Sequence, residues 1–156
     1  MSYRIGLDLG GTKVLGVVTD SDHKVIHRKK HRLSNRADIS AVMDQISNVY
    51  TALAEQVGDE KIDSVGIALP SPVDNELGHA KHLTAFQEKE LPVRDMLKER
   101  TGVDVKLGND VNMATLAEYK FGAGKGVSSL FTFYPGTGLG GGYIYKGKLV
   151  TGFNFT

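Results

Sequence analysis

The sequence has 156 residues, of which 24% are charged and 40% are hydrophobic, and its formal net charge is +1. That composition is typical of one globular domain with a core, and nothing in the near-neutral charge points to a nucleic-acid or anionic-membrane partner. The absence of cysteine excludes disulfides and thiolate zinc sites within the chain and fits a reducing cytoplasm, and no apolar run reaches the roughly 20 residues that a membrane span needs.

The first predicted elements are two strands, over residues 3–9 and 13–20, that flank a glycine turn. Gly10 and Gly11 allow positive φ and a close approach of the backbone to a ligand, and N–H groups in such a turn can point at a phosphate. Asp8, at the end of the first strand, is placed to hold Mg²⁺ directly or through water. The alternative is an ordinary Gly-Gly hairpin in which Asp8 is a turn residue.

A third strand is predicted over residues 24–32, and it carries the basic run 28–32. This run is either a nucleic-acid patch or the solvent-facing side of an edge strand, where lysines also discourage aggregation, and we favour the edge strand. Residues 37–57 predict the clearest helix, because their apolar side chains recur at spacings of three and four. Asp38 is a candidate N-cap for this helix, and Gly58 is its expected end.

A buried strand is predicted over residues 62–69. It ends at the proline loop 70–72, because two prolines in three residues stop both a strand and a helix. Residues 73–90 sustain no period and are expected to form a loop, which at that length is usually functional or mobile. A short helix over 93–101 and a short strand over 104–108 are predicted next.

Another helix is predicted over residues 111–121, directly after the pair Asn109-Asp110. Asp110 has two interpretations, which can both hold. It is an N-cap, a role worth about 1 kcal/mol, or it is a catalytic base at the carboxyl end of a strand, where open α/β sheets bind their ligands. The inward face of the helix is expected to consist of Met113, Ala114, Ala117 and Phe121.

The last segment of the chain repeats the plan of its opening. A strand over residues 128–134 leads into a glycine-rich turn at 135–142, and strands over 142–146 and 149–150 follow. This internal similarity predicts two lobes, of which the second starts near residue 128.

Four segments resemble, in order and across nearly the whole chain, the motifs of the ROK family (repressors, open reading frames and sugar kinases) in the actin-like and hexokinase-like ATPase superfamily. They are residues 8–13 (DLGGTK), residues 66–74 (GIALPSPVD), Asn109-Asp110 with Ala117-Glu118, and residues 136–142 (GTGLGGG). The resemblance implies an α/β fold with a ribonuclease-H-like (actin-like ATPase) lobe over residues 1–127, in which a mixed sheet is flanked by helices. It also implies that residues 128–156 are the first strands of a second lobe, with an ATP and sugar cleft between the lobes.

The resemblance further implies roles for individual residues. Asp110 is expected to be the catalytic base and to contact the sugar together with Asn109, Pro70 and His82. Asp8 is expected to coordinate Mg²⁺ and to lie at the phosphates of ATP. The two glycine turns expected at these phosphates consist of Gly10, Gly11, Thr12 and Lys13 in the first and Thr137, Gly138, Gly140 and Gly141 in the second.

One site residue departs from the family pattern. Sugar kinases of the family have an asparagine, in an Asn-Leu-x-Trp setting, where this chain has His82, so the identity of the sugar stays open. The family's Glu-x-Gly-His segment, its cysteine-rich zinc motif and its adenosine-binding segment are expected beyond Thr156. The 156 residues are therefore expected to be the N-terminal half of a longer protein, inactive alone and without a zinc site.

The resemblance therefore implies the N-terminal part of an ATP- and Mg²⁺-dependent hexose kinase, which we expect to be cytoplasmic and homo-oligomeric and to have no membrane partner. One alternative is a sugar-responsive transcription regulator of the same family, in which a DNA-binding helix-turn-helix precedes this lobe. A first strand near Tyr3 is expected to leave no room for that module, so a nucleic-acid partner is not expected. The other alternative is a non-catalytic sugar-binding fragment.

Overall fold

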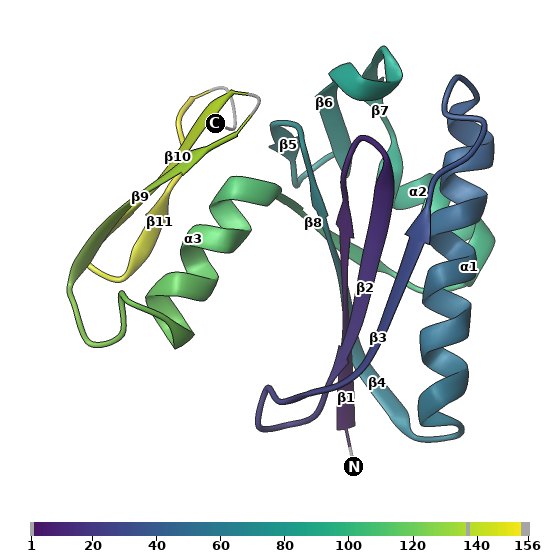
Figure 1. Ribbon diagram of the computed structural model, residues 1–156, viewed down its shortest axis with the longest axis horizontal. Helices are drawn as coiled ribbons and strands as arrows, with labels where there is room; N and C mark the ends of the chain where they lie inside the picture. The colour runs from purple at the N-terminus through teal and green to yellow at the C-terminus, as the bar shows by residue number, and fades with distance from the viewer. Residues whose placement is uncertain (1, 137, 154–156) are drawn as a thin grey trace.

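The computed structural model describes residues 2–136 and 138–153, and its largest layer is a five-stranded sheet (Figure 1). The strands are β1 (Ser2–Leu9), β2 (Lys13–Thr19), β3 (Val25–Arg32), β4 (Lys61–Leu69) and β8 (Val105–Asn109). Their order is β3-β2-β1-β4-β8, and the sheet is mixed because β1 runs antiparallel to β2 but parallel to β4. All five predicted strands are confirmed, as is the edge position of the basic strand β3.

Two helices, α1 (Ile39–Val57) and α2 (Val93–Thr101), cover one face of this sheet. The N-cap of α1 is Asp38, and the helix ends at Gly58, whose φ is +60°. Gly16 on β2 lets α1 approach closely, because a Cβ there would lie 2.5 Å from Cδ1 of Leu53. The core between the helices and the sheet includes Ile5, Leu9, Val14, Val18, Met43, Ile46, Leu53, Leu69 and Leu97.

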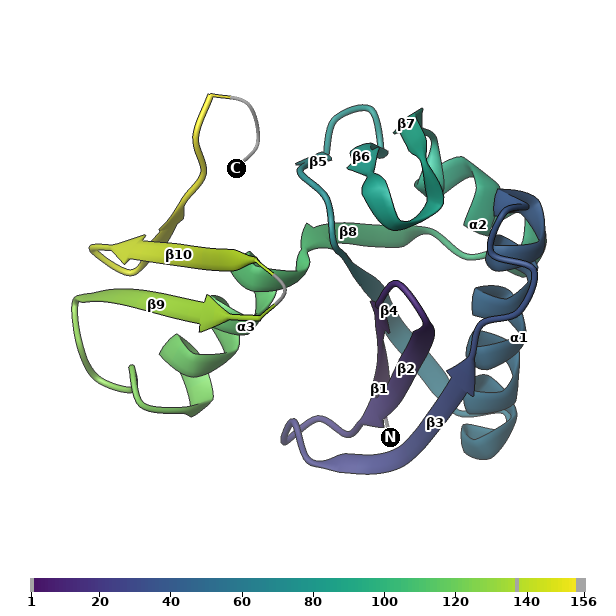
Figure 2. The same cartoon turned by 45° about the horizontal axis from the view of Figure 1, so that its top comes forward.

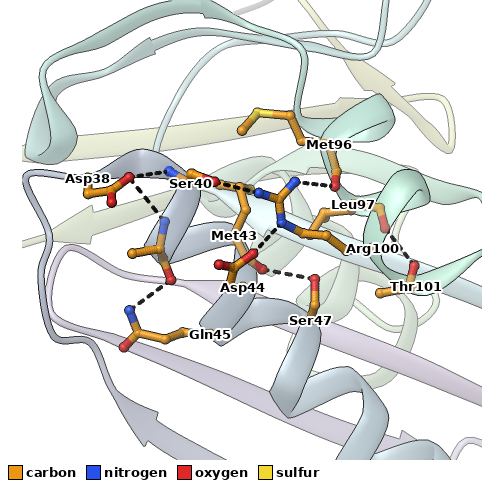
Figure 3. A network of polar contacts seen from close by, with 11 residues as sticks. Asp38, Ser40, Met43, Asp44, Gln45, Ser47, Met96, Leu97, Arg100 and Thr101 are labelled. Atoms are coloured by element: carbon orange, nitrogen blue, oxygen red, sulfur yellow. Dashed lines mark hydrogen bonds and ion pairs between the residues drawn. The ribbon is translucent and has the colours of Figure 1, made fainter.

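Arg100 ties α2 to α1 (Figure 3). Its Nε donates to the Asp44 carboxylate at 2.6 Å, and its Nη2 donates to Oγ of Ser40 at 2.7 Å. Figure 3 also shows Ser47, a buried serine whose hydroxyl donates to the Met43 carbonyl at 2.9 Å within α1. These contacts of Arg100 and Ser47 lie within the helical layer, whereas Gln45 of α1 contacts His31 of β3 at 3.0 Å.

The segment over residues 73–90, which was expected to be a loop, instead forms most of a small sheet. It contains β5 (Val73–Asp74), β6 (His79–Leu83) and the short 3-10 helix η1 (Thr84–Phe86), and it leads into β7 (Glu88–Leu91). The three strands pair antiparallel in the order β5-β6-β7. The loop expectation is wrong because strands this short carry too few residues to display a period, although Ala80, Leu83 and Leu91 are buried in the core.

Asp74 organises the turn between β5 and β6. Its Oδ1 accepts hydrogen bonds from the backbone N–H groups of Glu76 and Leu77, each at 3.0 Å, and Nζ of Lys81 lies 3.4 Å from its Oδ2. The hydrogen bond from Leu77 is the largest cause that holds the pKa of Asp74 below its ordinary value, and Lys81 adds to it. Arg94 of α2 holds the same turn from outside, since its Nη2 donates to the Asn75 carbonyl at 2.6 Å.

A second unit lies on the other side of the main sheet from α1 and α2 (Figure 2). It consists of α3 (Asp110–Phe121) and a three-stranded antiparallel sheet of β9 (Ser129–Pro135), β10 (Leu139–Tyr145) and β11 (Lys148–Val150). The division into lobes over 1–127 and 128–156 stays a prediction. No helix among the described residues is long and apolar enough to cross a membrane.

The predicted inward face of α3 is wrong in part. Met113 and Phe121 are 36% and 62% exposed, and the buried side chains of α3 are those of Asn112 and Thr115. Thr115 faces β9, where its hydroxyl is hydrogen-bonded to that of Thr132. The reason is that α3 packs mainly on the second sheet, so its most apolar face borders a cleft rather than a core.

The opposite face of the second sheet carries a cluster of exposed aromatic side chains. This aromatic cluster consists of Phe131, Phe133, Tyr143 and Tyr145, which are 54%, 67%, 38% and 48% exposed. Ring centroids are 4.6 Å apart for Phe131 and Phe133 and 6.2 Å apart for Tyr143 and Tyr145. Exposed apolar surface of this kind favours association.

We expect the 156-residue chain to self-associate through the aromatic cluster, so that light scattering gives a mass above 16.9 kDa. The double substitution Phe131→Ser and Phe133→Ser should shift the mass toward that of the monomer. Phe121→Ser is the matched control, because the exposed fraction of Phe121, 62%, lies between those of Phe131 and Phe133, but Phe121 is at the end of α3. A strict monomer in the unsubstituted chain would contradict the expectation.

Candidate functional site

The carboxyl ends of three parallel strands meet at one edge of the main sheet. Asp8 of β1 is paired with Ala68 of β4, and Leu69 of β4 is paired with Asn109 of β8. Since ligands of open α/β sheets bind at this edge, the chain turns that leave these strands are the candidate site. They are the β1–β2 turn, the proline loop 70–72 and the start of α3.

Asp8 and Asp110 line the same cleft, which has a volume of about 700 Å³ and opens between the sheet and α3. Much of the remaining wall is apolar and includes Leu15, Val17 and Met113. Shielding of the carboxyl from solvent by the surrounding protein is the larger cause that raises the pKa of Asp8. The charge of Asp110 raises that pKa further, and Lys13 partly opposes the rise. Two carboxylates that repel each other across a cleft favour a cation between them.

The first glycine turn is confirmed as a turn, but the expected conformational reason is wrong. Neither Gly10 nor Gly11 has a positive φ. The turn closes through a hydrogen bond from the Gly10 N–H to the Lys13 carbonyl at 2.8 Å. At Gly11 space is limited instead, because a Cβ there would lie 3.2 Å from Cβ of Ala85 and would crowd that residue. Thr12 joins the turn to the end of β3, since its carbonyl accepts from the Leu33 N–H at 2.9 Å.

The cap of α3 is Asn109 and not Asp110. Oδ1 of Asn109 accepts from the Asn112 N–H at 3.0 Å, and Asp110 is the first helical residue. The Asp110 carboxylate accepts from Nδ2 of Asn109 at 3.0 Å and from the Val111 N–H at 2.8 Å. The N-cap interpretation of Asp110 is therefore wrong, although its carboxylate, half-buried at the cleft, also accepts a first-turn N–H of the helix.

A second hollow, of about 280 Å³, lies beside Asn109. Four polar residues that line it were not predicted from the sequence, and these are Asn75, Glu76, Asn112 and Thr151. Asn112 follows Asn109 by one helical turn, which is the only sequence signal that could have indicated it. Pro70 and His82 line neither this hollow nor the larger cleft. His82 is connected to Asn109 through Ser71, which accepts from the His82 N–H and from Nδ2 of Asn109.

The second glycine-rich segment forms a shorter turn than expected. The Gly136 N–H donates to the Gly138 carbonyl at 2.8 Å, while Gly140 and Gly141 already belong to β10, opposite Tyr134 and Phe133. The predicted turn over 135–142 is too long, because β10 already begins at Leu139. Its glycines are poor strand formers, so the sequence carries no sign of a strand there. Thr137 lies outside the described residues.

Gly140 places the second glycine-rich segment beside the start of α3, where Asp110 is the candidate catalytic base. A Cβ at Gly140 would lie 2.7 Å from Cγ2 of Val111, the residue next to Asp110. The absence of a side chain therefore allows β10 to contact the first turn of α3. The second glycine segment and Asp110 are neighbours in space although about thirty residues separate them in the sequence.

The residues at the cleft fit a magnesium ion that arrives with phosphates. Within residues 2–136 and 138–153, no three His, Cys, Asp or Glu side chains gather as a complete metal cage. Mg²⁺ does not need such a cage, because it usually binds one or two carboxylates, substrate phosphates and water. Asp8, with Asp110 across the cleft, offers that donor set.

Comparison with known proteins finds sugar kinases that are similar to this chain. The chain is 32% identical over 152 residues to a glucokinase of Streptomyces coelicolor and 33% identical over 156 residues to an N-acetyl-D-glucosamine kinase of Escherichia coli. These matches cover 97% and 94% of this chain but only 46% and 48% of the two relatives, so the chain spans about half the length of the curated relatives it matches.

A solved structure is similar as well. The ROK family glucokinase of Streptomyces griseus, in complex with glucose and AMPPNP, superposes with a TM-score of 0.85 at 30% identity. The superposition covers 96% of this chain and 46% of that one. The sequence pattern of the ROK family matches residues 4–155, which is nearly all of the 156 residues, and the chain therefore belongs to the ROK family.

Proposed function

We propose that the chain is the N-terminal lobe of an ATP-dependent sugar kinase that transfers the γ-phosphoryl group to a hydroxyl of a hexose. The observation that carries the proposal is the placement of Asp8 and Asp110 in one cleft at the carboxyl edge of the sheet. The names of the relatives, glucokinase and N-acetyl-D-glucosamine kinase, support a hexose as substrate. Both ligands of such an enzyme are cytoplasmic metabolites, which supports a cytoplasmic location.

Asp110 acts as the general base in this proposal. Its half-buried carboxylate is oriented by Nδ2 of Asn109 and by the Val111 N–H, and one oxygen remains for a substrate hydroxyl. The carboxylate accepts the proton of that hydroxyl as its oxygen attacks the γ-phosphorus. A base in this role contributes typically 10²–10⁴-fold to the rate.

The phosphate side of the reaction uses the two glycine segments and Asp8. Gly11 and Thr12 supply backbone N–H groups, and Lys13 supplies one cation near Asp8. Gly140 brings the second glycine segment, Gly138 to Gly141, next to Val111 at the start of α3. Mg²⁺, when bound through Asp8 with ATP, offsets the charge of the phosphates. Phosphoryl transfer needs mainly such positioning and charge stabilisation from a protein.

The sugar lies beside Asp110 in this proposal, with Asn109 as its nearest polar neighbour. Both amide hydrogens of Asn109 are committed, to the Ser71 carbonyl and to Asp110, and its Oδ1 accepts from the Asn112 N–H. Since an amide oxygen has two lone pairs, Asn109 keeps one acceptor site for a sugar hydroxyl. His82, on β6, is connected to Asn109 through Ser71, and Pro70 is the residue before Ser71 in the proline loop.

We expect the complete gene product to release ADP from ATP in a coupled-enzyme assay when a hexose is present. Glucose, mannose and N-acetylglucosamine form the test panel, and omission of the sugar or of Mg²⁺ is the control. Sugar binding by calorimetry, without ADP release under any condition, would contradict the kinase proposal and favour a non-catalytic sugar-binding module.

The alternative within the family is a sugar-responsive regulator. It predicts that the complete gene product binds a DNA fragment and that a sugar changes this affinity. The edge position of β3 favours the simpler account of its basic residues, in which exposed cations protect an unpaired strand edge. The proposal therefore includes no nucleic-acid partner.

A further inference from the structure

Ser71 lies in the proline loop of the candidate site and is hydrogen-bonded both to β6 and to the start of α3. It lies between Pro70 and Pro72 in the connection from β4 to β5, and it is 3% exposed. Since proline has no N–H group, Ser71 supplies every hydrogen-bond donor of the loop 70–72. Its N–H donates to the Leu69 carbonyl at 2.8 Å, and its hydroxyl donates to the Pro72 carbonyl at 2.8 Å.

The Ser71 hydroxyl also holds β6. Its Oγ accepts from the His82 N–H at 2.9 Å, across eleven residues of sequence. The neighbouring Lys81 N–H donates to the Pro72 carbonyl at 2.9 Å. The strand that carries His82 is therefore attached to the proline loop at two successive residues, of which one depends on the Ser71 side chain.

The Ser71 carbonyl holds the start of α3. It accepts from Nδ2 of Asn109 at 3.2 Å, and the same amide group donates to the Asp110 carboxylate at 3.0 Å. A displacement of Ser71 would therefore change the orientation of the Asn109 amide. That amide in turn orients the carboxylate of the candidate base.

We propose that Ser71 is a positioning residue that couples β6 to Asp110, so that its hydroxyl sets where the sugar lies relative to the base. The proposal deepens the proposed kinase function and rests on it for its kinetic consequence. Ser71 itself touches neither the cleft nor the hollow beside Asn109. It acts through the His82 backbone on one side and through Asn109 on the other.

The kinetic test compares Ser71→Ala with Ser47→Ala in the complete gene product. Ser47 is a matched control, because it is also a buried serine whose hydroxyl donates to a carbonyl, but its bond lies within α1 (Figure 3). We expect Ser71→Ala to lower kcat/KM for the sugar about tenfold and to leave KM for ATP within about twofold. Ser47→Ala should change neither, and Ser71→Thr, which keeps the hydroxyl, should restore most of the loss.

A purely structural role for Ser71 predicts a different pattern. Both alanine variants would then lower the melting temperature by similar amounts, and kcat/KM for the sugar would stay within about twofold of the wild type in each. That result overturns the proposal. Equal losses of kcat/KM in Ser71→Ala and Ser47→Ala overturn it as well, since the effect would then follow from stability.

Hydrogen exchange on the 156-residue chain separates this proposal from the kinase proposal. Ser71→Ala should speed exchange about three- to tenfold both in β6, around His82, and at the start of α3, around Asn112, while Ser47→Ala leaves both segments unchanged. If no hexose is phosphorylated but this exchange pattern appears, the kinase function fails and the coupling stands. If exchange changes in β6 alone, Ser71 does not couple the two segments and the proposal fails.

Discussion

We expect Asp110→Asn to lower kcat of the complete gene product by about 10²–10⁴-fold while its sugar affinity changes far less. Asparagine has the shape of aspartate but cannot accept the proton of a sugar hydroxyl at neutral pH. The helix should survive, because Asn109 and not Asp110 caps α3. The measurements are kcat for the ATP-dependent step and sugar affinity by calorimetry.

Asp95→Asn is the control for this substitution. Asp95 lies in the first turn of α2, as Asp110 lies in the first turn of α3, so both acids interact with the dipole of a helix. Any change in melting temperature that stems from the dipole should appear in both variants, whereas the loss of kcat should appear in one. Retention of more than about a tenth of kcat in Asp110→Asn would remove Asp110 from the catalytic role.

The elements with a long, regular pattern could be predicted from the sequence. Helix α1 is an example, since its apolar spacing, its cap Asp38 and its end at Gly58 agree with one another and with the structure. The small sheet β5-β6-β7 could not be predicted, because its strands are short and are held by contacts with a core built from distant residues. The buried face of α3 was missed for a related reason, since the sheet it packs on lies later in the chain.

In the candidate site, too, residues within a local motif could be predicted, whereas roles that depend on distant partners could not. The motif positions of Asp8, Asn109 and Asp110 could be read from the sequence, and the structure brings all three to one edge of the sheet. Which residue caps α3 could not be read, because aspartate and asparagine are equally good caps. The role of Ser71 could not be read either, since its partners His82 and Asn109 lie 11 and 38 residues away.

We expect Asp8→Asn to lower kcat/KM for ATP by at least about 10²-fold and yet to raise the melting temperature at neutral pH. The loss of activity follows because Asp8 is the residue through which Mg²⁺ binds in the proposed function, and a metal ion supplies several kcal/mol of charge stabilisation. The gain in stability follows because solvent shielding and Asp110 raise the pKa of Asp8, so the ionised carboxylate is unfavourable in the folded state.

The sign of the pH dependence makes this prediction specific. A folded-state pKa above the ordinary value of 3.8 means that the folded state holds the proton more tightly than the unfolded state. The wild type therefore loses stability as the pH rises from 3.8 through the raised pKa of Asp8. Melting curves should show the advantage of Asp8→Asn at pH 7 and its disappearance at pH 3.

Asp63→Asn is the opposing control on the neighbouring strand β4. Hydrogen bonds from Ser2 and then Lys61 are the largest causes that lower the pKa of Asp63, so its ionised form stabilises the folded state. Its stabilisation is present above pH 3.8 and is lost as the pH falls through the lowered pKa. Asp63→Asn should therefore lower the melting temperature at pH 7, with no loss of activity. If Asp8→Asn also lowers the melting temperature at pH 7, Asp8 is held by favourable contacts, and the electrostatic conflict with Asp110 that supports a cation site is refuted.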